Sequence, residues 1–588
     1  MRVYGGGASR QDGAELLASM SADMQRAAAL PPGLARHSLL VGLLIDAGML
    51  AQGVADARFE VTGRDAKDAD DVTMALTAAL ARCCTTSWRS GFAEHGTLPF
   101  ALLARCQPAV PKQPLLLKVP EGYAFYALYP ETYAEAARRC REAAPRWEVV
   151  GLRSIGTSLA AMVAVGLGAP TPRSLRPVGH PFAREIAASP PEDVDPTTAF
   201  AVVDEGPGLS GSSMAAAGRW LQQAGITSTR LHFLTSHPGM PGPEASNDVR
   251  TLWADVSRQH LGFDEVVRDA PRVEHRLRHW VETLTGPLTQ PLQDIGGGAW
   301  RSLQVRNDGE PLPPAHPWQE RRKYLALSRT GTWLVKFVGL GRIGRRAYAR
   351  AQALAAAGFT PEPLGLCHGF IVERWRDDLR PLPARMSPTH RAAIVTRVGD
   401  YLAFRARTFP APDDSGASMP ALLEMTRCNA AEALGDAAGE RCTALARAFD
   451  QASAAVVRVE TDNRMHRWEW LGGPSLLLKT DAIDHATAHD LVGCQDIAWD
   501  VVGAEVEFDL SPEETSALIA RMAQQGIAVE RSLIALLRPA YLAFQWAHFA
   551  MAVNAADPAD AACRTLLAAA RDRYRDGLRS DLQVPVDR

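Results

Sequence analysis

The sequence predicts a multidomain α/β protein, and three features support this fold class. The chain has 588 residues, so at roughly 100–200 residues for each folding unit we expect about three or four units. Residues 113–285 alternate short apolar runs with helical patterns, which is typical of a parallel sheet flanked by helices. Residues 318–588 open with a hairpin-like stretch and then become mainly helical, which indicates an α+β unit.

Two further segments complete the predicted organisation. Residues 1–112 carry apolar residues at helical spacing, as in "DGAELLASMSADMQRAAAL", and predict a helical N-terminal extension. Residues 286–317 are rich in glycine and proline, which favours an interdomain linker.

The composition excludes several classes of function. A net charge of -3 gives no global attraction to nucleic acid or to a membrane. The start lacks a signal-peptide pattern, and the longest apolar runs fall short of the roughly 20 residues that span a bilayer. The nine cysteines form no C-x-x-C pair, which argues against a cysteine zinc site or a disulfide framework. We therefore expect a cytoplasmic protein that acts on small molecules and is compatible with a homodimer.

The stretch "VVDEGPGLSGSS" at 202–213 is the strongest candidate site. Asp204 and Glu205 follow an apolar strand, and ligands of open α/β sheets bind beyond the carboxyl ends of strands. The glycine-rich turn and the helix after it direct backbone N–H groups at an anion. No lysine follows these glycines, which disfavours a P-loop, whereas adjacent carboxylates suit the hydroxyl groups of a sugar phosphate. The predicted phosphate-binding residues are Gly206, Gly208, Leu209, Ser210, Gly211, Ser212 and Ser213.

A second turn of the same kind lies upstream in "WEVVGLRSIGTSLAAMVAVGLG". With the first, it resembles type I phosphoribosyltransferases, of the kind found in bacterial stress and tellurite-resistance gene neighbourhoods. The resemblance implies PRPP as co-substrate, Mg²⁺ as cofactor, and Asp204 and Glu205 as catalytic residues that fix the ribose. It also implies that pyrophosphate binds Arg153, Ser154, Ile155, Gly156 and Thr157. The sequence departs from the family in a turn that is one residue longer and in Glu205, where aspartate is more common.

Two neighbouring features have open interpretations. The basic stretch "TPRSLRPVGHPFARE" is either a loop that closes over pyrophosphate or a solvated loop. The aromatic residues of "EGYAFYALYPETY" either line the pocket of an acceptor or pack in the core; they include Tyr123, Phe125, Tyr126 and Tyr129.

The second unit carries a set of motifs in a recognisable order. Lys336 lies in the strand-like "TWLVKFVGL", Glu373 in "GFIVERW" before a hinge, and Asp462 and Asp481 in two later polar segments. This order resembles aminoglycoside and choline kinase-like phosphotransferases. The resemblance implies ATP binding by Lys336 and Glu373, and Asp462 as the catalytic aspartate. It further implies a metal at Asp481, with Glu469 in place of the usual asparagine, and convergence of Asp462 and Asp481 on one γ-phosphate and its Mg²⁺.

Departures from this second family leave two hypotheses open. "ETD" replaces H-G-D, no glycine-rich loop precedes Lys336, and no acidic residue lies between Lys336 and Glu362. The first hypothesis is a bifunctional enzyme that transfers phosphoribose from PRPP to an unknown acceptor with release of pyrophosphate. Its second unit would phosphorylate the product or a related small molecule. The alternative is a regulatory protein that senses PRPP or ATP through a degenerate kinase domain. We interpret the segment that contains Asp484, His485, His489 and Asp490 as a polar loop rather than a metal cluster.

Overall fold

The computed structural model describes residues 7–65, 71–303, 310–316, 319–473 and 476–584. Its N-terminal part consists of β1 (Ala8–Gln11), α1 (Gly13–Ala29), α2 (Leu34–Thr62), α3 (Val72–Arg89) and α4 (Phe100–Cys106). The Asp12 carboxylate accepts hydrogen bonds from the N–H groups of Ala14 and Glu15 and so caps α1. Helix α2 is long and apolar enough to cross a membrane, yet 89% of its most apolar window is buried inside the protein.

A five-stranded parallel sheet follows the N-terminal helices. Its order is β4 (Arg173–Leu175), β3 (Arg146–Leu152), β7 (Thr198–Val203), β8 (Leu231–Leu234) and β9 (Ser257–Gln259). All six residues of β7 are buried, as a strand covered on both faces requires. Helices α8 (Ser212–Gln223) and α9 (Asn247–Asp255) pack on the face of Phe200 and Val202. Helices α6 (Pro130–Cys140) and α7 (Ile155–Leu167) pack on the other face.

Smaller elements complete this half of the molecule. Strand β2 (Leu115–Lys118) pairs with β1, and β5 (Pro177–His180) and β6 (Ala183–Ile186) form an antiparallel hairpin. Two further helices are α5 (Glu121–Phe125) and α10 (Leu277–Thr285). Single-turn segments are η1 (Gln107–Ala109), η2 (Arg141–Ala143), η3 (Ser228–Arg230), η4 (Asp264–Arg268) and η5 (Val273–His275).

The second half has a sheet lobe and a helical lobe. The antiparallel sheet has the order β10 (Gln293–Asp294), β11 (Lys323–Ser328), β12 (Gly331–Phe337), β14 (Phe370–Arg374) and β13 (Pro363–Cys367), with α11 (Gly341–Ala356) beside it. The helical lobe contains α12 (Pro388–Thr408), α13 (Met419–Leu434), α14 (Asp436–Thr443), α15 (Ala446–Ala452), α16 (Ala498–Glu507), α17 (Pro512–Gln524), α18 (Arg531–Ala555) and α19 (Ala561–Asp581). Its short strands are β15 (Arg380–Pro381), β16 (Arg458–Val459), β17 (Trp470–Gly472), β18 (Leu477–Lys479) and β19 (Gln495–Asp496). The single-turn segments of the helical lobe are η7 (Ser453–Ala455), η8 (Arg467–Glu469) and η9 (His485–Thr487). One more, η6 (Ala299–Leu303), precedes β11.

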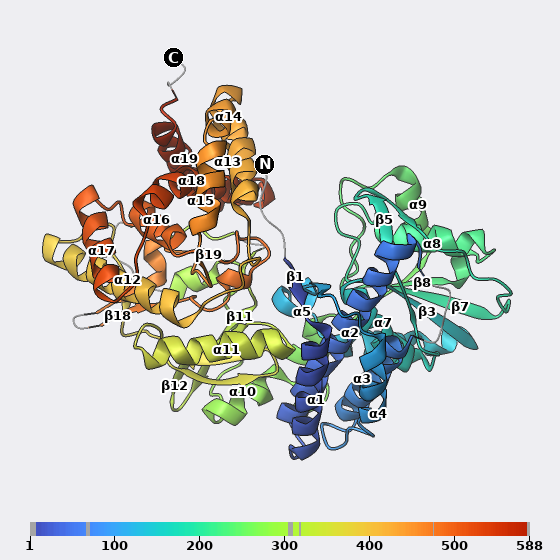
Figure 1. The fold of residues 1–588 in the computed structure, drawn as a ribbon. Helices are drawn as coiled ribbons and strands as arrows, with labels where there is room; N and C mark the ends of the chain where they lie inside the picture. The colour runs from blue at the N-terminus through green and yellow to red at the C-terminus, as the bar shows by residue number, and fades with distance from the viewer. Residues whose placement is uncertain (1–6, 66–70, 304–309, 317–318, 474–475, 585–588) are drawn as a thin grey trace.

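The two halves share one apolar core. The largest cluster of buried side chains contains residues of α2, of β7 and of β12 and β14 in the antiparallel sheet. Figure 1 shows α11 beside α1 and α2, and Arg342 and Arg345 of α11 form ion pairs with Asp46 (2.8 Å) and Asp23 (2.5 Å). The described part of 286–317, where the composition predicts a linker, contributes β10 to the antiparallel sheet.

Candidate functional site

Lys336 lies at the centre of a charged cluster between the two lobes of the second half. It is 3% exposed on β12, and its Nζ contacts the carboxylates of Asp481 and, at 2.9 Å, Asp484. Burial lowers the pKa of Lys336, but the two carboxylates outweigh burial and hold the pKa above its ordinary value. The structure thus brings together the predicted phosphate lysine and the predicted metal ligand.

A cavity of about 190 Å³ lies at this cluster. Its wall combines the antiparallel sheet, the hinge after β14, and the polar loops of the helical lobe. Segments outside the two lobes also line it, including Phe125 and Tyr126 from the first half and Ile295, Trp300 and His316 from the predicted linker region. Glu373 lines the same cavity, and burial raises its pKa to about 7, against the charge of Lys336.

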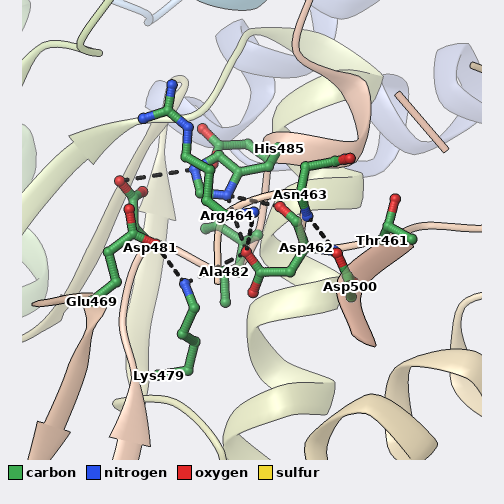
Figure 2. Close-up of polar contacts among 12 residues, drawn as sticks. Thr461, Asp462, Asn463, Arg464, Glu469, Lys479, Asp481, Ala482, His485 and Asp500 are labelled. Atoms are coloured by element: carbon green, nitrogen blue, oxygen red, sulfur yellow. Dashed lines mark hydrogen bonds and ion pairs between the residues drawn. The ribbon is translucent and has the colours of Figure 1, made fainter. Parts of the chain in front are cut away.

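Asp462 lies behind the wall of this cavity rather than on it. Its side chain is fully buried and accepts a hydrogen bond from the Tyr401 hydroxyl, and the Lys479 Nζ lies 3.5 Å away. Burial raises its pKa, but Lys479 and the other neighbouring cations outweigh burial and lower it. Asp500 lies beside the Asp462 loop (Figure 2), and its carboxylate accepts a hydrogen bond from the backbone N–H of Asp462 at 2.7 Å. Among the described residues that line the cavity, Asp481 is present and Asp462 is not, and the expected convergence of the two on one γ-phosphate stays a prediction.

Glu469, Lys479, Asp484 and His485 surround Asp481 and complete the site. The Lys479 Nζ donates to Glu469 at 2.7 Å, so the carboxylate predicted to bind metal already has a cationic partner. His485 lies between two carboxylates, with Nδ1 3.3 Å from Asp462 and Nε2 3.9 Å from Asp481 (Figure 2). The donor atoms of Asp481, Asp484 and His485 lie within 4.8 Å of one another, a group able to hold a cation. Asp484 and His485 thus belong to the charged cluster around Lys336 and Asp481, and their interpretation as members of a polar loop stays a prediction.

Aromatic residues of the first half cover this cavity. The Arg321 guanidinium lies 4.5 Å from the Phe125 ring centroid, and its Nε lies 3.1 Å from Asp484. The Tyr126 hydroxyl and His489 Nε2 are 2.6 Å apart. Tyr123 and Tyr129 are fully buried, as core packing requires. The motif therefore divides between the core and the cavity of the other half.

In the first half, the two predicted anion-binding turns lie side by side. Strands β3 and β7 are parallel neighbours, so both turns leave the same edge of the sheet. A Cβ on Gly156 would lie 2.7 Å from the Val203 carbonyl oxygen, and the turns therefore approach as closely as glycine allows. Ser154 has a φ of 92°. Ile155 begins α7, and the Thr157 hydroxyl is buried with no hydrogen-bond partner in the described part of the chain.

The guanidinium group of Arg153 is engaged by carboxylates of the protein. Its guanidinium contacts Asp56 of α2 at 2.9 Å and also Asp65, and its side chain is 5% exposed. The predicted pyrophosphate role of this side chain therefore requires that a ligand displace carboxylates from the N-terminal part.

The carboxylates of Asp204 and Glu205 have no cationic partner among the residues that the structure describes. They are half-buried at the end of β7, and no ion pair to either is found within the described ranges. Burial raises the pKa of Asp204 to about 7. Burial, Asp204 and Glu121 raise the pKa of Glu205 to about 8. Near neutral pH the pair is therefore partly protonated.

The predicted phosphate-binding turn leads into a helix whose N-terminus has no side-chain cap, and the β5–β6 hairpin contacts this turn. Gly208 and Gly211 have φ values of 56° and 64°, which favour glycine. Helix α8 begins at Ser212 without a side-chain cap. The Ser212 hydroxyl donates to the Pro181 carbonyl at 2.8 Å, so the tip of the β5–β6 hairpin contacts the turn. This hairpin lies within the basic stretch for which a closing loop is one of the two interpretations.

Comparisons with known proteins give structural neighbours only. No protein-family model matches the chain, and no curated protein matches it. Choline kinase LicA from Streptococcus pneumoniae is 13% identical over 44% of this chain and 89% of its own, with a TM-score of 0.32. The spectinomycin phosphotransferase APH(9)-Ia is 12% identical over 52% of this chain and 98% of its own, with a TM-score of 0.35. A choline/ethanolamine kinase family protein from Mesorhizobium loti is 14% identical over 50% of this chain and 94% of its own, with a TM-score of 0.27. The neighbours of this chain are thus choline- and aminoglycoside-kinase-like phosphotransferases.

Proposed function

We propose that the second half is a phosphotransferase that binds ATP with Mg²⁺ between its lobes and phosphorylates a small molecule. The observation that carries this proposal is the contact of Lys336 with Asp481 and Asp484 at the edge of the cavity. Phosphoryl transfer needs mainly positioning and stabilisation of charge, which a buried lysine and metal-binding carboxylates supply.

Nucleotide binding at this site is an exchange of partners. Lys336 would leave its carboxylates for phosphate oxygens, and Asp481 and Asp484 would hold Mg²⁺, which prefers carboxylate and phosphate oxygens. The negative charges of Asp481 and Asp484 stay compensated, because Mg²⁺ replaces the ammonium group of Lys336 beside them. Arg321 and Lys323 lie within 3.4 Å of the same carboxylates and would limit the repulsion between them.

Asp462 fits a positioning role better than that of a base. Its oxygens are engaged by Tyr401, Lys479 and His485 inside the protein. This burial is also what favours the alternative, a regulatory protein that binds ATP without transferring its phosphate.

The Asp481→Asn variant tests the proposal. We expect it to lose Mg²⁺-dependent ATP binding in calorimetry and ATP-dependent labelling of amine and hydroxyl compounds. Asp450→Asn, an exposed aspartate of α15, is the matched control. Unchanged ATP binding by Asp481→Asn would contradict the site. ATP binding by the native protein with no ADP formed would favour the regulatory alternative.

A second candidate function is phosphoribosyl transfer from PRPP in the first half. It is favoured by the adjacent turns after β3 and β7 and by the carboxylates of Asp204 and Glu205, which form no ion pair in the described part of the chain. The carboxylates would accept hydrogen bonds from ribose hydroxyl groups, and the open start of α8 would receive the 5′-phosphate. In the reaction the bond from C1′ to pyrophosphate breaks and a bond from C1′ to the acceptor forms. The carboxylates would stabilise the positive charge that develops at C1′.

Titration with PRPP and Mg²⁺ tests this second function. Asp204→Asn should abolish saturable PRPP binding and pyrophosphate release, whereas Asp248→Asn, on the exposed surface of α9, should leave both unchanged. Native-like pyrophosphate release by Asp204→Asn would exclude the proposed role of this residue.

A further inference from the structure

Three buried side chains from distant parts of the chain meet at the junction of the two halves. They are His37 of α2, Glu131 of α6 and His368 in the turn between β13 and β14. The Glu131 Oε1 lies 2.8 Å from His37 Nε2 and 3.5 Å from His368 Nε2. No side chain of the three is more than 1% exposed. Their donor atoms all lie within 4.8 Å of one another.

Several polar atoms of this cluster lack a partner. In the described part of the chain, both ring nitrogens of His368, the His37 Nδ1 and the Glu131 Oε2 make no hydrogen bond. Within the same ranges Glu131 forms ion pairs with histidines but with no lysine or arginine. A buried carboxylate needs a neutralising charge, and unpaired buried polar atoms destabilise a fold. The cluster therefore has the charge and the free donor atoms that a bound cation would satisfy.

The surroundings hold these side chains in place and exclude water. His368 has a φ of 43°, which is unusual for a residue with a side chain, and its carbonyl accepts a hydrogen bond from Tyr129. The His37 ring lies 4.9 Å from the Phe92 ring, and the His368 ring lies 5.4 Å from Trp280. The backbone of His368 thus adopts a strained conformation, and the His368 imidazole packs against the rings of Tyr129 and Trp280.

We propose that His37, Glu131 and His368 bind a zinc ion buried at the junction of the two halves. Two imidazole nitrogens and one carboxylate oxygen are a donor set that zinc uses, and ligands about 2.0–2.1 Å from tetrahedral zinc lie about 3.3 Å apart. The two measured contacts of 2.8 Å and 3.5 Å bracket that spacing. A zinc ion here joins the N-terminal helices, the parallel-sheet half and the antiparallel sheet. It is independent of both proposed activities.

Metal analysis of the full-length chain tests the site. After zinc loading and gel filtration we expect one tightly held zinc ion in native protein and in Asp484→Asn, but not in His368→Gln. Asp484→Asn serves as the control because Asp484 belongs to the other group of donor atoms, beside Asp481 and His485. X-ray absorption of the zinc in Asp484→Asn should show two imidazole ligands. That measurement keeps the test valid if His368→Gln fails to fold.

Chelation gives an independent readout. EDTA should lower the Tm of native protein, and added zinc should restore it, whereas His368→Gln should respond to neither. Native protein that takes up no zinc, or His368→Gln that holds zinc as tightly as Asp484→Asn, would overturn the proposal. An unchanged native Tm in EDTA, with the metal removed, would overturn it as well. The cluster would then be a buried carboxylate that is hydrogen-bonded to His37.

Discussion

The two halves of the molecule hold their site carboxylates in opposite electrostatic states. Asp204 and Glu205 of the first half have no cationic partner in the described part of the chain, and burial raises their pKa values to about 7 and about 8. For Asp481 and Asp484 of the second half, burial also raises the pKa, but nearby cations outweigh burial and lower it. A ligand can therefore reach Asp204 and Glu205 without displacing a cation, whereas a ligand of Asp481 and Asp484 must first break an ion-pair cluster.

The largest effect that would break this comparison is expected at Lys336. Lys336→Met leaves the buried carboxylate of Asp484 and the part-buried carboxylate of Asp481 without their closest cation, so we expect a loss of about 3–5 kcal/mol in the free energy of unfolding. Chemical denaturation measures it, and Lys118→Met on the exposed face of β2 should change stability by less than about 0.5 kcal/mol. Adding Asp484→Asn should recover part of the loss. A loss under about 1 kcal/mol would mean that the carboxylates already face water.

An effect of comparable size is expected at Asp204 and depends on pH. Its folded pKa of about 7 lies above the ordinary value of 3.8, so the folded state binds more protons than the unfolded state between these values. Stability should therefore fall as pH rises from 4 through 7. Asp204→Asn removes this fall, with a gain at pH 8 of about 1.4 kcal/mol for each pKa unit and no gain at pH 4. Denaturation curves at the two pH values measure the difference, and equal gains at both would contradict an uncompensated carboxylate.

The smallest effect concerns the contact that connects the first half to the cavity of the second. Tyr126→Phe removes the hydrogen bond to His489, which is worth about 0.5–1.5 kcal/mol. Because Tyr126 lines the cavity, we expect a weaker Kd for ATP of up to about tenfold, with little change in Tm. Tyr348→Phe on α11, which is not among the described lining residues, is the control. A Kd equal to that of the native protein would show that the aromatic cover does not contact the nucleotide.

Local patterns predict the features of the fold that depend on neighbouring residues. The apolar runs from Arg146 to Leu234 form a parallel sheet because strands buried on both faces read as continuous hydrophobic segments. The adjacent turns follow from that sheet, since neighbouring parallel strands end at the same edge. The strand that carries Lys336 likewise reads as one arm of a hairpin.

Long-range partners explain what the sequence did not show. Asp462 is enclosed because Tyr401 and Lys479, which lie elsewhere along the chain, reach it. Arg153 is engaged by Asp56 and Asp65 of the N-terminal part, which showed no recognisable chemistry. Periodicity contains no information about such contacts. The roles assigned to these site residues stay predictions.

The apolar core that runs from α2 into the antiparallel sheet has a practical consequence for anyone who wants to study one activity at a time. A chain cut between residues 285 and 318 would expose an apolar surface on both fragments and would remove β10 from its sheet or from its connection to the first half. Neither fragment is expected to stay soluble in isolation. The two proposed activities are therefore best separated by point substitutions in the intact chain and not by truncation.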